Sequence, residues 1–160
     1  MKIRRASMKD MKTLLDLYDE LLELEIAKYD PTLIPKWSYT KHGIEYFTEM
    51  INGNYTSVAE VDDKVVGYLA GKINEKNDYE LYQYGEIDNI CVTKECRGQG
   101  IGTALIKDFM GYCKENGIED FKVVACAKDR DAINFYHKLG FGDFDVTLPS
   151  VTLNYDSVDL

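Results

Sequence analysis

The stretch Arg97-Gly98-Gln99-Gly100-Ile101-Gly102-Thr103 decides how this chain is interpreted. It lies between a run typical of a β-strand, residues 87–92, and an amphipathic run, residues 101–113. Glycine has no Cβ, so the backbone of such a loop can come close to a ligand. The first N–H groups of a following helix lack intrahelical partners, and the helix dipole adds partial positive charge there. A strand, a glycine-rich turn and a helix in this order therefore predict a site for a phosphate group.

The composition bounds the class of protein. The chain has 160 residues, of which 45% are hydrophobic and 29% charged, so we expect one folded domain over residues 1–160 with a polar tail from about residue 156. No apolar run is long enough to span a bilayer, and the first five residues lack the apolar segment of a signal peptide. We therefore expect a cytoplasmic protein with no membrane partner.

The formal net charge of −9 argues against a nucleic-acid partner, which needs a basic surface. The same charge is compatible with a cationic small substrate, although it could equally serve solubility alone. Four cysteines, Cys91, Cys96, Cys113 and Cys126, form no Cys-x-x-Cys pair and have no zinc-like spacing to a histidine, so we expect no metal. Cys91 is expected to be a packing residue, and His42 and His137 are expected at the surface.

Hydrophobic periodicity predicts the element order β-α-α-β-β-β-α-β-α-β-β. The expected helices cover residues 11–26, after an N-cap at Ser7, and residues 39–51, 101–116 and 129–139. The expected strands cover residues 2–6, 55–61, 65–73, 81–92, 121–127, 141–148 and 151–154. Because hairpins alternate with crossover helices, we expect an α/β (α+β) fold whose mixed, mostly antiparallel sheet has six to seven strands and about four flanking helices.

Two common phosphate-binding classes are excluded by the position and chemistry of the loop. A P-loop would need a Gly-Lys-Ser/Thr sequence, which the chain lacks. A dinucleotide-binding fold would place its glycines near the first strand, whereas Gly98, Gly100 and Gly102 follow three predicted antiparallel strands.

The glycine loop and a second segment together resemble a known family. Arg97-x-x-Gly100-x-Gly102 is similar to the Arg/Gln-x-x-Gly-x-Gly/Ala motif of the GNAT superfamily of acyl-CoA-dependent N-acyltransferases. Residues 132–141, Ala-Ile-Asn-Phe-Tyr-His-Lys-Leu-Gly-Phe, are similar to that family's Ala-x-x-Phe-Tyr-x-x-x-Gly-Phe segment. Two motifs at this separation, in this element order, are more specific than either alone.

This resemblance covers essentially the whole chain and implies a GNAT-like three-layer fold. It implies transfer of an acetyl group from acetyl-CoA directly to a primary amine of a small molecule or peptide. A non-catalytic acyl-CoA-binding regulatory module on the same fold is an alternative. A toxin-like acetyltransferase acting on aminoacyl-tRNA is another, but the charge of −9 counts against it. A homodimer, common in the family, also stays open.

The resemblance implies how coenzyme A is held. The amides of residues 98–103 would chelate the pyrophosphate, with Arg97 and Thr103 adding charge or a hydroxyl. The pantetheine arm would pair with the strand near Ile90, in the gap that a strand bulge opens in the family; the sequence does not show whether this bulge exists. The implied cofactor-binding residues are Ile90, Cys91, Val92, Arg97, Gly98, Gln99, Gly100, Ile101, Gly102, Thr103, Asp129 and Phe135. The family usually has Asn where this chain has Asp129, whose carboxylate cannot donate, so we expect a helix N-cap with a weakened cofactor role.

Acyl transfer to an amine needs a base for the ammonium proton, a donor to the oxyanion and a proton for the leaving thiolate. Tyr136 resembles the family's general acid, although its helical spacing also fits a core residue. Glu86 and Asp88 are candidates for the base, with Glu86 slightly preferred, and both could instead attract a cationic substrate or face solvent. For the acceptor, an aromatic pocket could be formed by Tyr29, Trp37, Tyr79, Tyr82 and Tyr84, which could equally be core or interface residues.

Overall fold

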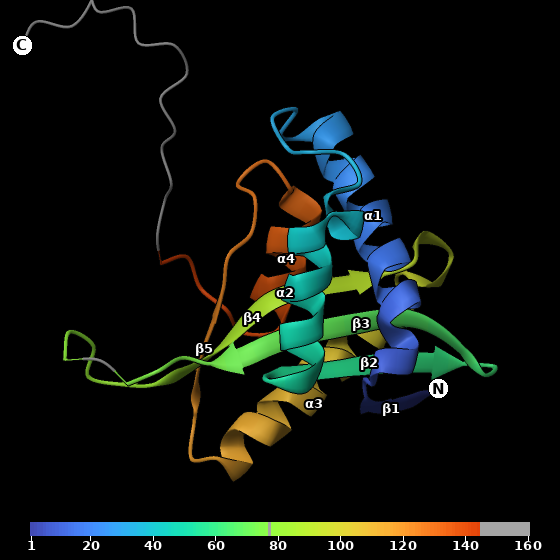
Figure 1. The fold of residues 1–160 in the computed structure, drawn as a ribbon. Coiled ribbons are helices and arrows are strands. Elements are labelled where there is room, and N and C mark those ends of the chain that lie inside the picture. The colour runs from blue at the N-terminus through green and yellow to red at the C-terminus, as the bar shows by residue number, and fades with distance from the viewer. Residues whose placement is uncertain (77, 145–160) are drawn as a thin grey trace, which may run out of the picture.

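The computed structural model describes residues 1–76 and 78–144, and within them five strands form one sheet in the order β1-β2-β3-β4-β5 (Figure 1). The strands are β1 (Lys2–Arg5), β2 (Tyr55–Val61), β3 (Lys64–Ile73), β4 (Tyr84–Val92) and β5 (Asp120–Val123). The first four strands pair antiparallel, whereas β5 runs parallel to β4. The helices are α1 (Met11–Lys28), α2 (Lys41–Asn52), α3 (Ile101–Glu115) and α4 (Arg130–Lys138), with short 3-10 turns η1 (Met8–Asp10), η2 (Trp37–Tyr39) and η3 (Lys94–Cys96).

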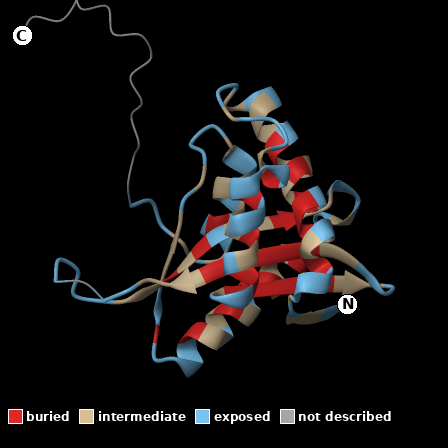
Figure 2. Cartoon of the chain, in the orientation of Figure 1, coloured by how far each residue is buried: buried red, intermediate tan, exposed pale blue. Residues whose placement is uncertain are grey.

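Helices cover both faces of the sheet, with α1 and α2 in front of it in Figure 1 and α3 and α4 behind. Because side chains alternate along a strand, each central strand contributes residues to two hydrophobic cores, one on each face of the sheet. Tyr68 and Ala70 of β3 pack with α1 and α2, whereas Leu69 packs with α3. Figure 2 shows the buried residues along the middle strands and the inward sides of the helices. The expected three-layer, mixed α/β architecture is therefore confirmed. In the described ranges, no helix is long and apolar enough to cross a membrane.

The expected count of six to seven strands is too high for the described residues. Residues 141–144, which the sequence assigned to a strand, form none. The reason is that Phe141 completes the end of α4: its N–H donates to the Tyr136 carbonyl at 3.2 Å, after Gly140 turns the chain with φ of 94°. The remainder of this predicted strand, the strand predicted at residues 151–154 and the polar tail lie outside the described residues.

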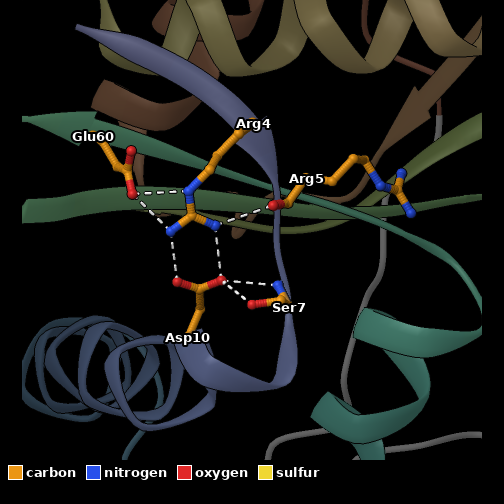
Figure 3. Close-up of polar contacts among 5 residues, drawn as sticks. All are labelled: Arg4, Arg5, Ser7, Asp10 and Glu60. Atoms are coloured by element: carbon orange, nitrogen blue, oxygen red, sulfur yellow. Dashed lines mark hydrogen bonds and ion pairs between the residues drawn. The ribbon is translucent and has the colours of Figure 1, made fainter. Parts of the chain in front are cut away.

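An ionic network around Arg4 joins β1 to the start of the first helix (Figure 3). The guanidinium of Arg4 donates to both carboxylate oxygens of Asp10, at 2.9 and 2.8 Å, and its Nε donates to Glu60 at 2.8 Å. Asp10 Oδ2 also accepts from the backbone N–H of Ser7 at 2.8 Å and from its hydroxyl at 3.0 Å. Ser7 is the N-cap of the 3-10 turn η1, whereas the N-cap of α1 itself is Asp10. The hydrogen bonds from Arg4 lower the pKa of Asp10 to about 2.

We expect Asp10→Asn to lower the free energy of unfolding by about 2 kcal/mol, because Arg4 loses its bidentate partner. Urea denaturation at neutral pH measures this loss. Glu45→Gln is a matched control, since Glu45 is exposed and its ion pairs are with the exposed side chains of Lys41 and His42. The control should change the free energy of unfolding by less than about 0.5 kcal/mol.

The same ion pair predicts how stability depends on pH. The pKa of Asp10 is lowered from 3.8 to about 2 by folding, so its contribution is complete above pH 3.8 and is lost as the pH falls through about 2. The difference in unfolding free energy between the wild type and Asp10→Asn should therefore shrink over this range. A difference that stays constant down to pH 2 would contradict this explanation.

Candidate active site

A β-bulge interrupts β4 at Asp88. The register with β3 pairs Ala70 with Asn89 and Gly71 with Ile87, which leaves Asp88 without a partner in β3. An extra residue in one strand bends it and locally changes the side to which side chains point. The bulge that the sequence left undecided is therefore present.

The bulge turns two consecutive polar side chains toward the α1 and α2 side of the sheet. Asp88 accepts a hydrogen bond from the Tyr46 hydroxyl of α2, and Asn89 Oδ1 accepts from the Tyr68 hydroxyl at 2.5 Å. Ile87 and Ile90, on either side of this pair, pack instead with the core that α3 covers. In a regular strand, neighbours such as Asp88 and Asn89 would point to opposite faces.

The pairing of β4 with β5 ends where the bulge begins. The last pair in the register is Ile87 with Val123, and a cavity of about 130 Å³ lies next to this point. Its lining consists of Leu21, Glu25, Ile87, Asp88, Asn89, Ile90, Val123, Val124, Ala125, Cys126, Asp129, Ala132 and Tyr136. Within the described chain, residues 88–92 of β4 pair with β3 only, so the backbone groups on their other edge, apart from the Val92 carbonyl that accepts from Arg97, are available to an extended ligand.

The glycine loop is exposed and has the backbone conformation that glycine allows. Gly98 and Gly100 have φ of 74° and 81°, and a Cβ on either would meet no heavy atom within 4 Å. Both positions thus require glycine for conformation and leave open space beside the backbone. Gly100 precedes α3 without a side-chain cap, and Ala104 N–H is bonded to its carbonyl at 3.0 Å. The amides that a capping side chain would satisfy remain available to an anion.

Gly102 and Phe135 contact each other rather than the cavity. A Cβ on Gly102 would lie 3.1 Å from Cζ of Phe135, so glycine lets α3 and α4 approach closely. Phe135 is not among the residues that line the cavity in the described structure. Their place in the two sequence motifs therefore has a packing explanation, besides the cofactor role that the resemblance implies. Ile101 is buried in the same core, while Thr103 is half-buried.

Glu20 of α1, which the sequence analysis did not identify, fixes the start of the glycine loop. Its carboxylate accepts from Lys94 N–H at 3.0 Å and from the Thr93 hydroxyl at 3.1 Å, and it lies 3.3 Å from Arg97 Nη2. Arg97 Nε donates to the Val92 carbonyl at 2.8 Å. Arg97 therefore ties the loop to β4 and α1. In the sequence, Glu20 is one of several acidic residues on an amphipathic helix, so no local signal marks it.

Tyr136 is 9% exposed and lines the cavity. Its ring centroid lies 5.3 Å from that of Phe135 and 5.7 Å from that of Phe141. No described residue forms a hydrogen bond with its hydroxyl, so the hydroxyl is free to meet a ligand. Burial, with a smaller effect from Asp129, raises the pKa of Tyr136 to about 12, so the phenol keeps its proton at neutral pH.

The two candidate bases share a strand face but differ in their access to the cavity. Lys72 Nζ lies 3.6 Å from Glu86 Oε2 and 3.7 Å from Asp88 Oδ1. Asp88 belongs to the cavity lining, whereas Glu86 does not in the described structure. Tyr46 donates to Asp88, and burial followed by this hydrogen bond raises the pKa of the Tyr46 phenol, which therefore stays protonated.

Two further carboxylates reach the cavity from helices on opposite faces of the sheet. Asp129 Oδ1 accepts from Ala132 N–H at 3.0 Å, which confirms the expected N-cap of α4. Glu25 of α1 was not identified from the sequence. Burial raises its pKa, and the nearby charges of Asp129 and Asp30 add to the effect.

The remaining reactive side chains have structural explanations. Cys91 is buried, its thiol donates to the Leu17 carbonyl at 3.2 Å, and burial raises its pKa to about 12, so its expected packing role is confirmed. The Gln99 side chain donates to the Glu95 carbonyl at 3.2 Å within its own loop. His42 and His137 are exposed, as expected. In residues 1–76 and 78–144, no group of three His, Cys, Asp or Glu could hold a metal.

None of the five aromatic residues that could form an acceptor pocket lines the cavity at the bulge. Tyr79 and Tyr82 are 97% and 69% exposed. Trp37 does join an aromatic cluster, but its partners are Tyr18 and Tyr46, each with a ring centroid 5.8 Å from that of Trp37. These two tyrosines have the helical spacing of core residues, so nothing in the sequence marks them as partners of Trp37.

Comparison with known proteins agrees with this geometry. The acetyltransferase (GNAT) family model matches residues 14–141. An N-alpha-acetyltransferase of Sulfurisphaera tokodaii is 30% identical over 151 residues, which cover 91% of this chain and 82% of that protein. An uncharacterized N-acetyltransferase of Methanocaldococcus jannaschii is 37% identical over 89 residues, which cover 56% of this chain and only 39% of that protein.

Solved structures show the same fold. An aminoglycoside acetyltransferase from an uncultured soil metagenomic sample, in complex with trehalose, is 26% identical with a TM-score of 0.68 and covers 96% of each chain. A Bacillus halodurans protein reaches a TM-score of 0.79 at 19% identity, over 95% of this chain and 100% of that one, which is a likeness of fold. The bulged strand, the glycine loop and the family match over most of the chain lead to one conclusion: this chain belongs to the acetyltransferase (GNAT) family.

Proposed function

We propose that this chain is an N-acetyltransferase that transfers an acetyl group from acetyl-CoA directly to a primary amine of a small molecule or peptide. The observation that carries the proposal is the cavity at the β4 bulge, which Tyr136 and Asp88 both line. A protonated phenol and a carboxylate at one small cavity are the acid and base that such a transfer needs. Family membership supports the choice of acetyl donor.

The loop and strand fit a coenzyme A molecule by their own geometry. The open backbone at Gly98 and Gly100 and the uncapped start of α3 suit a pyrophosphate. The free edge of β4 at Ile90, Cys91 and Val92 suits the amide-rich pantetheine arm. Bound acetyl-CoA would supply the acetyl group as an activated thioester.

The residues of the chain would then hold and move protons. Tyr136 keeps its hydroxyl proton at neutral pH and donates it into the cavity, so we infer that it is the general acid. Asp88 accepts a proton from the incoming ammonium, directly or through a water molecule, while Lys72 and Tyr46 hold its carboxylate in place. We infer Asp88 rather than Glu86 as the base, because of these two only Asp88 lines the cavity.

The type of acceptor is part of this proposal. The Sulfurisphaera tokodaii relative is named an N-alpha-acetyltransferase, and the metagenomic structure is an aminoglycoside acetyltransferase. The carboxylates at the cavity and the net charge of −9 favour a small cationic amine. The alternative, a non-catalytic acyl-CoA-binding module, would bind acetyl-CoA but would release no thiol when amines are added.

We expect Tyr136→Phe to lower kcat by about 100-fold or more while acetyl-CoA binding is retained, because the variant removes one proton donor and keeps the ring packing. Release of free thiol over a panel of amines measures turnover, and calorimetry measures acetyl-CoA affinity. Tyr112→Phe is the matched control, since Tyr112 of α3 stacks on Tyr55 away from the cavity. Unchanged turnover in Tyr136→Phe would overturn the acid role, and acetyl-CoA binding with no thiol release from the wild type would favour the non-catalytic module.

We expect Gly100→Glu to weaken coenzyme A binding by at least about 10-fold. The substitution places a side chain at φ of 81° and brings a carboxylate to the proposed phosphate site. Gly111→Glu makes the same chemical change in the middle of α3, where a Cβ also meets open space. Equal dissociation constants for the two variants, measured by calorimetry, would show that the loop does not hold the phosphates.

A further inference from the structure

The cavity at the β4 bulge is lined by three carboxylates and, among the described residues, by no basic side chain. The carboxylates come from Glu25 of α1, Asp88 of β4 and Asp129 at the start of α4. The other lining residues are apolar or uncharged, and the cavity has a volume of about 130 Å³. Like charges around so small a space repel one another, and a cation between them would remove this cost.

The three carboxylates differ in how the protein itself neutralises them. Asp88 lies 3.7 Å from Lys72 and accepts from the Tyr46 hydroxyl, so it is already partnered. Within the described chain, Glu25 and Asp129 form no ion pair, and Asp129 uses one oxygen for the N-cap of α4. Lys128, next to Asp129, donates to the Tyr29 carbonyl at 3.2 Å and does not line the cavity. Among the described residues, Glu25 and Asp129 therefore have no cationic partner, although Tyr29 also hydrogen-bonds with Asp129.

The hydroxyl of Tyr136 is a second observation that points to a ligand at this cavity. The Tyr136 side chain is more than nine-tenths buried and reaches the cavity, yet its hydroxyl has no partner among the described residues. Among the described residues, the fully buried side-chain atoms without a hydrogen-bond partner are Asp19 Oδ1 and Ser57 Oγ, so the Tyr136 hydroxyl is open to the cavity, where a ligand can reach it. Asp129 adds to the raised pKa of both Glu25 and Tyr136, and all three residues line the same cavity.

We propose that the acceptor is a small aliphatic dication: a primary amine that reacts near Tyr136 and Asp88, with a second ammonium bound by Glu25 and Asp129. In this arrangement Glu25 determines specificity, because it binds the second ammonium of the acceptor and does not touch the nitrogen that is acetylated. This proposal rests on the proposed acetyltransferase function.

Three amines with four carbon atoms each test the proposal. Putrescine ends in a second ammonium, butylamine in a methyl group and γ-aminobutyrate in a carboxylate. We expect kcat/KM for putrescine to exceed that for butylamine by at least about 10-fold, with γ-aminobutyrate the poorest, and the preference to shrink as salt is raised. Calorimetry with putrescine and no acetyl-CoA should give a measurable affinity that butylamine lacks. A peptide with a free N-terminus is the fourth substrate.

Glu25→Gln should reduce kcat/KM for putrescine by about 10-fold, mainly through KM, and should lower the ratio of kcat/KM for putrescine to that for butylamine by a similar factor. Glu23→Gln is the matched control, because it removes one carboxylate from the same helix, where Glu23 is exposed and contacts Lys36 at 3.4 Å. The control should keep the preference for putrescine.

Each outcome either supports or overturns the dication proposal. Equal rates with putrescine and butylamine, a faster reaction with the peptide, or a preference that persists in Glu25→Gln would overturn it and leave the acetyltransferase function standing. Acetyl-CoA binding with no acetylation of any amine would overturn both. The comparison of amines on the wild-type chain tests the proposal even if Glu25→Gln does not fold.

Discussion

The bulge of β4 at Asp88 is the constraint on which the candidate site depends. One extra residue ends the regular pairing of β4 with β5 at Ile87 and Val123, and it turns Asp88 and Asn89 to the same face of the sheet. The first effect leaves a free strand edge and a cavity. The second places Asn89 beside Asp88 in the lining of that cavity. In a regular β4, Asn89 would point to the opposite face from Asp88.

Helix α1 connects the two halves of the site. Glu20 holds the connection between β4 and α3 through Lys94, Thr93 and Arg97. Leu21 and Glu25, four residues apart and therefore on one helix face, line the cavity. The loop proposed to bind the acetyl donor and the wall proposed to bind the acceptor are thus positioned by adjacent residues of one rigid element. This explains why the helix has acidic residues on more than one side.

Local sequence patterns predicted most helices and strands well, but they did not predict which residues meet at the candidate site. The four helices follow from hydrophobic spacing, and Asp129 was recognised as an N-cap from its place before α4. Phe141 was wrongly assigned to a strand, because an apolar residue after Gly140 can begin a strand or close a helix. Glu86 and Asp88 look equivalent in the sequence, and only the register of β4 separates them. Glu25 carried no signal, because acidic residues are ordinary on an exposed helix.

The sequence by itself determined the glycine loop, the order of strands and helices and the resemblance carried by residues 97–103 and 132–141, because these depend on neighbours along the chain. The tertiary structure decided that Glu25, Asp88, Asp129 and Tyr136 line one cavity, and that Gly102 and Phe135 serve packing. These residues come from separate segments of the chain, and their meeting depends on strand register and helix packing. Such long-range geometry is not encoded in the spacing of residues within any one segment.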